Sequence, residues 1–445
     1  MEFDEIGGGR SSIDEAVAAA LSSLDSIDPA TAADAQLGWE GLRGLSPPAG
    51  PTQSSVQTFL WQHLVEIAED RERAWEIALA LAELLDRLGH ARYADIARSP
   101  RTRALLDNTD DAGRQSEIAD AVAASGIGPP DTDLITWQDT PEDPELAVVS
   151  LIGETLEVAT IAGEFAPSRV GGRPLRDAAV AAKRRRLTDS VLRSERAGGV
   201  LIEQLLDHRI MLWTRYSPPR IELYRDTAEV LHEAVEPAYS CVRRLEGLLA
   251  LVGDGIDLTE RGYLPGAVVE RALGTLWTPS EWPFPPGEEI DTVPVLRVRR
   301  LLRRLGLVRR HHGRLLPTAR ARGMSADRMW TTLIGGFVGT AYPPDTIAAE
   351  VVFADIARGA PPAGEAELLT EILTAEGWTH HGGPVPSESV GPLAGDVLAD
   401  LTALGAFTYD ATRRGSSTTV PSPDGVRLGA ALLRHRLLHT QMPSL

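Results

Sequence analysis

The chain is patterned as a series of helices separated by glycine- and proline-rich breaks. Apolar residues recur at three- and four-residue spacing over residues 59–67 and 75–88, which predicts two packed helices. The same spacing returns over 200–213 and over 221–251. Strict alternation of apolar and polar residues is confined to short runs, so we predict a mainly α protein with short β-hairpins and a multi-helical N-terminal half.

One stretch, residues 294–322, has the pattern of a small complete unit. Five apolar residues share one helical face: Val295, Val298, Leu301, Leu302 and Leu305. Gly306 follows and is a natural helix stop, because glycine accepts the left-handed conformation. Two short apolar runs then flank the polar tip His311-His312-Gly313, which predicts a hairpin. A helix, a tight turn and a hairpin are the outline of a winged helix.

A later stretch repeats this pattern with different charge. Apolar residues over 397–404 precede Gly405, residues 407–420 can form a hairpin around Arg413-Arg414-Gly415, and a closing helix is expected from Gly425 to His439. Aligning VLRVRRLLRRLGL with VLADLTALGAF brings the two stretches into register. We therefore predict two tandem winged-helix-like modules.

Changes in composition divide the chain into five predicted segments. They are a flexible acidic arm over 1–52, a helical domain over 53–133, a helical domain with a basic helix over 134–245, an arginine-rich module over 246–330 and an acidic module over 331–445. The proline-rich linker 277–287 carries Trp277 and Trp282, which we expect either to cover a domain joint or to bind a peptide.

Charge is sorted along the chain. The formal net charge is −19, yet residues 294–322 hold ten arginines and no acidic residue. The candidate binding residues are Arg297, Arg299, Arg300, Arg303, Arg304, Arg309, Arg310 and Arg314, with a secondary basic patch at Lys183, Arg184, Arg185 and Arg186. Guanidinium groups on a helix and its hairpin suit phosphates, and the alternative is that they pair with acidic groups of this chain or of a partner protein.

The second module provides an internal contrast. Its helix carries Asp396 and Asp400 where the first has arginines, so two equivalent DNA-reading modules are not expected. We expect the acidic module to serve protein contacts, and one module to pack on the other.

Motifs for catalysis were sought and not found. The glycine-rich run 335–339 lacks the Lys-Ser/Thr pair of a phosphate loop, and the chain has no Gly-x-Ser-x-Gly motif. His435 and His439 have a spacing compatible with metal ligands, but no carboxylate or cysteine accompanies them in register, so a surface or partner-facing role is expected. Cys241 lies in an apolar helix and is expected to be buried and structural. We predict no catalytic residue, no cofactor, no metal and no enzymatic activity.

Three features of the sequence bear on where in the cell the protein is expected. A single cysteine cannot form an internal disulfide, the N-terminus is acidic where a secretory signal would be basic and then apolar, and no run of about 18 apolar residues occurs. We predict a cytoplasmic protein that does not span a membrane. The sequence leaves its oligomeric state open.

The run LVGDGIDLTERGYLPGAVVERA, followed by PVLRVRRLLRRLGLVRRHHGRLLPTARAR, supports a resemblance. It resembles the C-terminal part of uncharacterised proteins of high-GC bacteria related to plasmid- and insertion-sequence-borne open reading frames. The matching residues are Leu258, Thr259, Gly262, Tyr263, Leu264, Pro265, Val268, Leu305, Gly306, Leu307 and Thr318. The resemblance covers roughly residues 245–330 and, more faintly, residues 56–106. No catalytic residue can be carried over from it.

These observations lead to one functional hypothesis and two alternatives. The leading hypothesis is a non-enzymatic regulatory or scaffold protein whose arginine-rich module contacts an acidic surface, either nucleic acid or an acidic protein. The first alternative is a protein-binding adaptor whose arginines are paired within the chain. The second is an enzyme of a class that its motifs do not identify.

Overall fold

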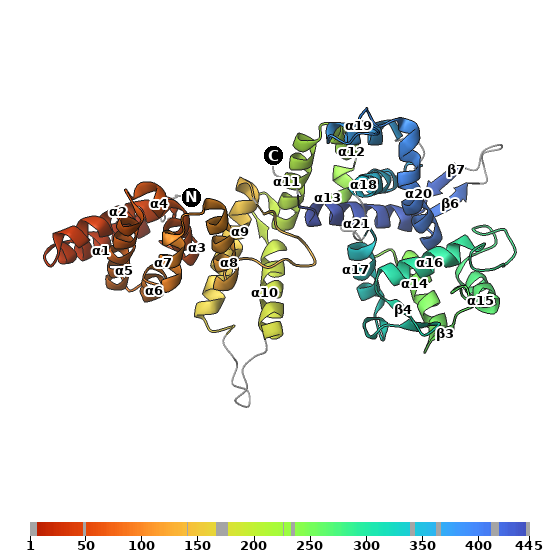
Figure 1. The fold of residues 1–445 in the computed structure, drawn as a ribbon, viewed down its shortest axis with the longest axis horizontal. Helices are drawn as coiled ribbons and strands as arrows, with labels where there is room; N and C mark the ends of the chain where they lie inside the picture. Colours follow the sequence, from red (N-terminus) through yellow and green to blue (C-terminus); the bar gives the residue numbers. More distant parts are fainter. Residues whose placement is uncertain are drawn as a thin grey trace. The chain divides into compact units, whose positions relative to one another are not determined.

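The computed structural model describes residues 7–47, 50–139, 141–165, 177–225, 227–232, 236–338, 343–361, 366–410 and 418–441. The protein is mainly helical, with a few short antiparallel strand pairs (Figure 1). It divides into two compact units. Unit 1 comprises Met1–Thr132 and Pro141–Ser194, and unit 2 comprises Asp133–Thr140 and Glu195–Leu445. Within the described ranges, every helix is too short or too polar to cross a bilayer.

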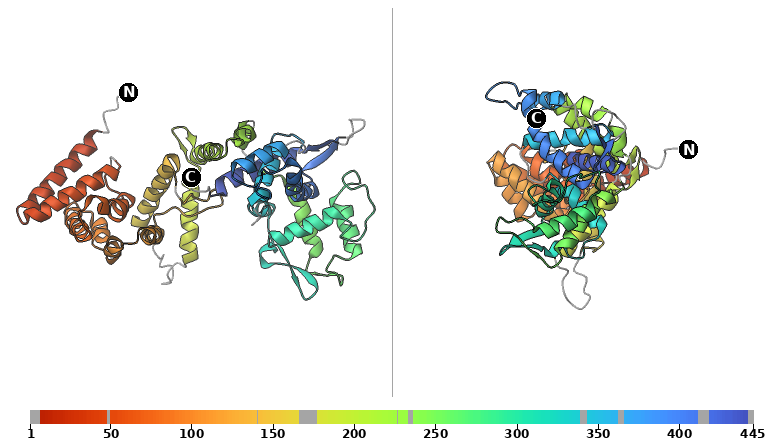
Figure 2. Two further views of the ribbon diagram at one scale, coloured as in Figure 1. Left: turned by 45° about the horizontal axis from the view of Figure 1, so that its top comes forward. Right: turned by 90° about the vertical axis from the view of Figure 1, so that its right-hand side faces the viewer.

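The described residues of unit 1 form helices and no strand (Figure 2). They are α1 (Gly7–Asp25), α2 (Pro29–Leu45), α3 (Gln53–Thr58), the π-helical turn η1 (Phe59–His63), α4 (Leu64–Ile67), α5 (Arg71–Arg87), α6 (Ala91–Ala97), α7 (Pro100–Asp107), α8 (Asp111–Ser125), α9 (Asp143–Ile161) and α10 (Asp177–Leu192).

The segment predicted as a flexible acidic arm is part of the core of unit 1, which corrects that expectation. The side chain of Asp28 caps the first turn of α2, and Pro29 opens the helix, where its missing N–H costs nothing. Helix α2 packs along α5 and buries Trp39 and Leu42. The sequence did not predict that this helix is packed, because alanine and glycine allow close helix packing without a strong apolar periodicity.

A buried carboxylate joins α9 to the rest of unit 1. Glu157 accepts hydrogen bonds from the backbone N–H of Gln53, at 2.8 Å, and from the hydroxyl of Tyr93, at 2.7 Å. Burial and this carboxylate raise the pKa of Tyr93 well above its ordinary value. The contact fixes α9 against the start of α3 and against α6.

Unit 2 combines helices with three small sheets. Its elements are β1 (Glu195–Arg196), β2 (Gly199–Val200), α11 (Leu201–Tyr216), α12 (Arg220–Arg225), α13 (Ala228–His232), α14 (Tyr239–Val252), β3 (Ile256–Asp257), α15 (Gly266–Leu276), α16 (Val293–Arg304), β4 (Val308–His311), β5 (Arg314–Pro317), the 3-10 turn η2 (Ala319–Ala321), α17 (Ala326–Gly336), α18 (Pro343–Ala357), α19 (Ala366–Ala375), α20 (Ser387–Leu404), β6 (Phe407–Asp410), β7 (Thr418–Pro421) and α21 (Pro423–His439).

The arginine-rich stretch forms the helix and hairpin that its pattern predicts. Helix α16 ends at Arg304, and Gly306 follows with φ +68°. Strands β4 and β5 pair antiparallel with Val308 opposite Pro317, and β3 adds to the other edge of β5. The three-stranded sheet therefore has the order β3-β5-β4.

The second stretch repeats the helix and hairpin. Helix α20 ends before Gly405, which has φ +84°, and β6 and β7 pair antiparallel with Phe407 opposite Pro421. The predicted turn Arg413-Arg414-Gly415 lies outside the described residues. Helix α21 starts two residues before Gly425, because the Ser422 hydroxyl caps its first turn.

The five predicted segments do not coincide with the two units. Residues 195–245 belong to the same unit as the two C-terminal segments, and residues 133–139 run beside the end of α21. There the Thr136 N–H donates to the Leu438 carbonyl at 3.0 Å. Arg209, which is buried on α11, donates to the carbonyls of Thr136 and Thr440. It therefore holds both segments against α11.

Candidate functional site

Helix α16 presents one apolar face and arginines on the remaining surface. Val295, Val298 and Leu302 are fully buried, and Pro294 occupies the first turn, where its ring is tolerated. With the apolar stripe turned inward, the arginines must lie along its flanks or outward. Their position on the helix decides which of them meet other elements.

Two of these arginines, on one flank of α16, are paired with α20. Arg297 lies 2.7 Å from a carboxylate oxygen of Asp396 and 3.6 Å from one of Asp400. Arg304 donates to Asp400 at 2.8 Å, and its guanidinium also lies 5.5 Å from the ring centroid of Phe337. The two helices pack directly, so the acidic helix covers this flank.

Arg299, on the opposite flank, is also held within the chain. It pairs with Glu289, which is fully buried and also accepts the Leu264 N–H at 2.6 Å. A buried carboxylate without such partners would be strongly destabilising. Arg299 therefore anchors the linker before α16 and is not available to a partner.

The other predicted arginines remain on the surface. Arg300 and Arg303 on α16, with Arg309 and Arg310 on β4, are exposed, and no described residue forms an ion pair with any of them. We call these four residues the open arginine face. Arg314 on β5 is exposed too, and pairs with Asp257 at 3.1 Å. Surface pairs of this kind contribute little and exchange readily with other anions.

The hairpin that carries half of this face has a tight tip. His312 and Gly313 both have positive φ, +46° and +75°, which is the backbone of a two-residue turn. Gly262 also has a positive φ, and a Cβ there would come within 2.8 Å of the Arg310 guanidinium. The glycine thus lets Arg310 lie close against the neighbouring loop.

The secondary basic patch on α10 is only half open. Lys183 donates to the Glu164 carbonyl at 2.9 Å, and Arg184 donates to the Gly128 carbonyl at 2.7 Å. Burial lowers the pKa of Arg184. Arg185 and Arg186 are exposed, and no described residue pairs with them. The patch therefore combines two residues that hold α10 in place with two that face solvent.

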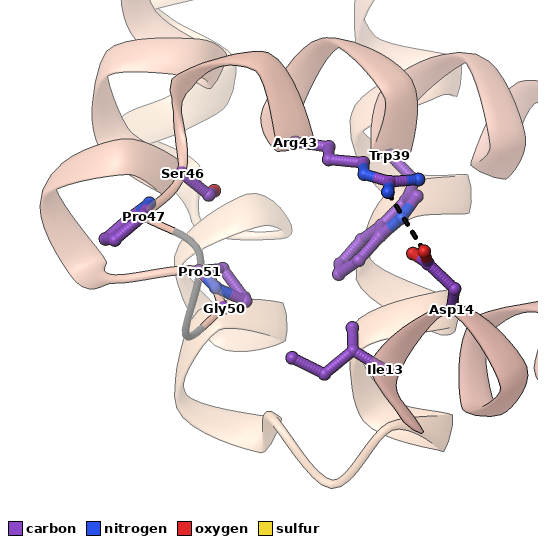
Figure 3. Close-up of a pocket in the computed structure, with 8 residues that line it drawn as sticks. All are labelled: Ile13, Asp14, Trp39, Arg43, Ser46, Pro47, Gly50 and Pro51. Atoms are coloured by element: carbon purple, nitrogen blue, oxygen red, sulfur yellow. Dashed lines mark hydrogen bonds and ion pairs between the residues drawn. The ribbon is translucent and has the colours of Figure 1, made fainter. Parts of the chain in front are cut away.

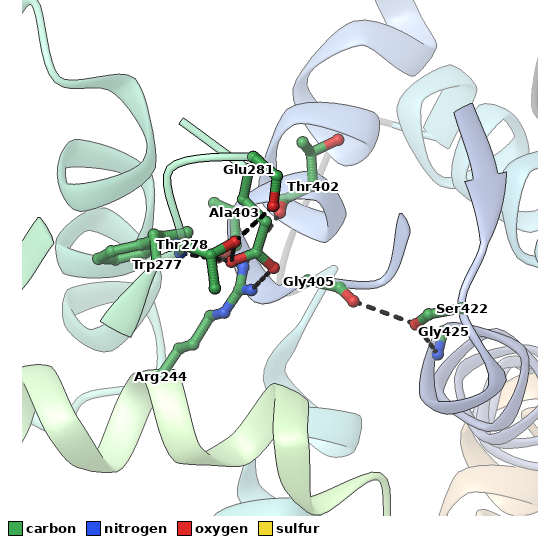
Figure 4. A network of polar contacts seen from close by, with 10 residues as sticks. Arg244, Trp277, Thr278, Glu281, Thr402, Ala403, Gly405, Ser422 and Gly425 are labelled. Atoms are coloured by element: carbon green, nitrogen blue, oxygen red, sulfur yellow. Dashed lines mark hydrogen bonds and ion pairs between the residues drawn. The ribbon is translucent and has the colours of Figure 1, made fainter. Parts of the chain in front are cut away.

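Arg244, Trp277 and Glu281 form a polar cluster at the C-terminal end of α20 that the sequence did not predict (Figure 4). We call this cluster the α20 clamp. Arg244 of α14 donates to the Ala403 carbonyl at 2.9 Å and also pairs with Glu281. Trp277 donates its indole N–H to the same carbonyl at 3.2 Å, and the Arg244 guanidinium lies 5.5 Å from its ring. Trp277 thus packs against the end of α20 inside unit 2. Neither Arg244 nor Glu281 belongs to a motif that would have marked it.

A second unpredicted cluster is centred on the buried side chains of Arg220, Tyr224 and Glu350. Arg220 of α12 donates to Glu350 of α18 at 2.7 Å and pairs with Glu376, while Tyr224 also donates to Glu350. Arg436 of α21 lies 3.5 Å from the same carboxylate. Burial alone would raise the pKa of Glu350, but Arg220 and Arg436 lower it to about 2. Arg220, Glu350 and Tyr224 are buried and, among the described residues, face no pocket or groove with a free polar group, so we assign this cluster to stability.

The candidate metal and nucleophile residues have structural positions. His435 is not the surface residue expected: it is partly buried, its ring centroid lies 4.0 Å from that of His439, and burial and this neighbour lower its pKa to about 3. Cys241 is buried as predicted, and burial raises its pKa to about 12, so its thiol stays protonated. Among the described residues, no three or more His, Cys, Asp or Glu are grouped to hold a metal ion.

A small pocket in unit 1 carries little reactive chemistry (Figure 3). Trp39, Ile13 and Pro51 form much of its wall. Its charged groups, Arg43 and Asp14, pair with each other at 3.0 Å. With those charges satisfied by each other, the open arginine face of unit 2 is the better candidate for a binding site.

Comparison with known proteins brings no further information about this site. No family model, no curated protein and no solved structure matches the chain. The resemblance to proteins of high-GC bacteria therefore stays a prediction, and the function has to be argued from the geometry.

Proposed function

We propose that the protein binds a polyanion, with the phosphate backbone of nucleic acid as its partner, through the open arginine face. The observation that carries the proposal is that four guanidinium groups stand on adjoining elements, α16 and β4, without an acidic partner among the described residues. Phosphate contacts by arginine give affinity that depends on salt and not on base sequence.

The order of the elements supports a winged-helix-like module as the scaffold. Helix α14, strand β3, helices α15 and α16 and the hairpin β4–β5 follow one another along the chain, and β3 joins the hairpin in one sheet. In such modules the last helix and the hairpin meet nucleic acid together. Here α20 covers one flank of that helix, so we propose contact by the hairpin and the C-terminal half of α16, and not deep insertion into a groove.

The intramolecular alternative accounts for some of the arginines. Arg297, Arg299 and Arg304 are paired with acidic residues of the chain. Pairing does not extend to the open arginine face, which is why a binding role describes those four residues better. The chain's overall negative charge is compatible with this role, because screening over about 8 Å makes the local patch decisive on contact.

The test compares two double variants of equal charge. Arg309→Ala/Arg310→Ala removes half of the open arginine face, and Arg185→Ala/Arg186→Ala removes two arginines of α10 that are also exposed. Binding to labelled duplex DNA is measured by fluorescence anisotropy over a range of salt. We expect the first variant to weaken binding about tenfold and to reduce the slope of log affinity against log salt by about 1.8.

Each other outcome rejects the proposal. Loss of binding that follows Arg185→Ala/Arg186→Ala would move the site to α10. An unchanged Arg309→Ala/Arg310→Ala variant, or a wild-type protein that does not bind duplex DNA or heparin at low salt, would leave the open arginine face without this function.

A further inference from the structure

Two carboxylates of α20 are aligned with two arginines of α16. Asp396 and Asp400 lie one helical turn apart, and Arg297 and Arg304 lie two turns apart, each pair on one side of its own helix. Arg297 reaches both carboxylates, at 2.7 and 3.6 Å, and Arg304 reaches Asp400 at 2.8 Å. The contact joins the helix that precedes one hairpin to the helix that precedes the other.

Stability does not explain these carboxylates. The side chain of Asp396 is 84% exposed, and an ion pair so open to water contributes little. Asp400 is nearly buried, and burial raises its pKa in spite of Arg304 and Arg297. Burial therefore makes the ionised form of Asp400 less favourable than it would be in water. An apolar or amide side chain at this position would stabilise the fold at least as well.

The carboxylates do change which arginines are free to meet another anion. Arg297 is 20% exposed and Arg304 is 38% exposed, and both are held by carboxylates of α20. Arg300 and Arg303 on the same helix, in contrast, are exposed and have no acidic partner among the described residues. A carboxylate and a phosphate compete for the same guanidinium donors, because both accept its forked N–H groups. Arg297 and Arg304 would extend the open arginine face along α16 if α20 did not hold them.

We infer that α20 is a built-in competitor of the polyanion: Asp396 and Asp400 withhold Arg297 and Arg304 from it and confine binding to the open arginine face. This inference rests on the proposed function. It means that the module binds more weakly, and over fewer phosphates, than its arginine content would permit.

The experiment neutralises the competitor in the full-length chain. The variant Asp396→Asn/Asp400→Asn keeps the shape of both side chains and removes their charge. In the duplex-DNA assay, we expect at least tenfold tighter binding and a slope against log salt that is steeper by about 1.8, as two more phosphates are contacted. Asp396→Asn alone, at an exposed position, is expected to give a smaller change in the same direction.

A matched control separates local competition from general charge. Glu367→Gln/Glu371→Gln makes the same change in net charge on α19, where both residues are exposed and pair with no described residue. This control is expected to leave the slope unchanged and to tighten binding by less than about threefold, since distant surface charges are screened. Thermal unfolding of each variant checks that the fold is kept.

The outcomes separate this inference from the proposed function. The inference is overturned if Asp396→Asn/Asp400→Asn behaves like the α19 control, even when Arg309→Ala/Arg310→Ala weakens binding as proposed. It is also overturned if adding Arg297→Gln/Arg304→Gln leaves the gain intact. Suppose that the wild type does not bind but Asp396→Asn/Asp400→Asn does, through Arg297 and Arg304. The inference that α20 competes with the polyanion is then supported, and the open arginine face is rejected as the binding site. If neither binds, both proposals fail.

Discussion

The stretch around α16 and the stretch around α20 share a local design but have opposite charge. Each has a helix that ends before a glycine of positive φ and continues into an antiparallel hairpin. The first helix has arginines on both flanks, and the second presents Asp396 and Asp400. The two helices pack against each other with these charges paired, so they do not form two equivalent surfaces. If the proposed function holds, one repeated helix-and-hairpin shape supplies both the binding element and the helix that covers one flank of it.

Two buried carboxylates of unit 2 differ in the groups that surround them. Glu289, before α16, is satisfied by one arginine and one backbone N–H. Glu350, on α18, is surrounded by Arg220, Arg436 and Tyr224. More charged groups surround Glu350 than Glu289. We therefore expect substitution of Glu350 to lower the free energy of unfolding more.

The largest effect is therefore expected from Glu350→Gln. Removing this carboxylate leaves Arg220 buried without one of its partners, which costs about 3–5 kcal/mol of the free energy of unfolding. Arg427→Ala, which removes an exposed ion pair of α21, should cost less than about 0.5 kcal/mol. Urea unfolding measures both. Equal midpoints for the two variants would show that the buried cluster does not support the fold.

A smaller effect is expected from pH through His435. Its pKa is lowered from 6.5 to about 3, so as pH falls below 6.5 the unfolded chain takes up a proton that the folded chain does not. Stability should fall by about 2 kcal/mol between pH 6.5 and 4, less than the full shift would give because the ring stays partly exposed. Melting curves of His435→Gln should lack this part of the pH dependence. His311→Gln, on the exposed hairpin, should retain it.

The two helix-ending glycines provide a matched pair. Gly306→Ala places a Cβ in open space and costs about 1 kcal/mol, from its positive φ alone. Gly405→Ala has the same backbone cost, and its Cβ would also lie 2.6 Å from the Arg244 guanidinium that clamps α20, which raises the cost to about 2 kcal/mol. Urea unfolding of the two variants side by side tests the clamp. Equal costs would contradict it.

The smallest effect on stability belongs to the open arginine face. Arg309→Ala/Arg310→Ala should change the free energy of unfolding by less than about 0.5 kcal/mol, because neither guanidinium has a partner among the described residues. A large loss of stability in thermal or urea unfolding would mean that these residues are part of the fold, and would favour the intramolecular alternative.

Much of the fold could be predicted because it follows from local patterns. The glycines after α16 and α20, the polar tip His311-His312-Gly313 and the apolar face of α16 each act over a few residues, and each was found where expected. The arm over 1–52 was predicted wrongly, because α2 packs with alanine and glycine and shows little periodicity. The arginine cluster was identified as a set, but its division into paired and open residues was not.

The sequence by itself determined the local elements, because turn residues and apolar spacing act on neighbouring positions. It also determined that positive charge concentrates at α16 and β4, since residue identity fixes charge. Only the tertiary structure decided which arginines are available. Arg297 meets Asp396 across about a hundred residues of chain, and Arg220 meets Glu350 across 130. No local pattern encodes such encounters, because they depend on how distant helices pack.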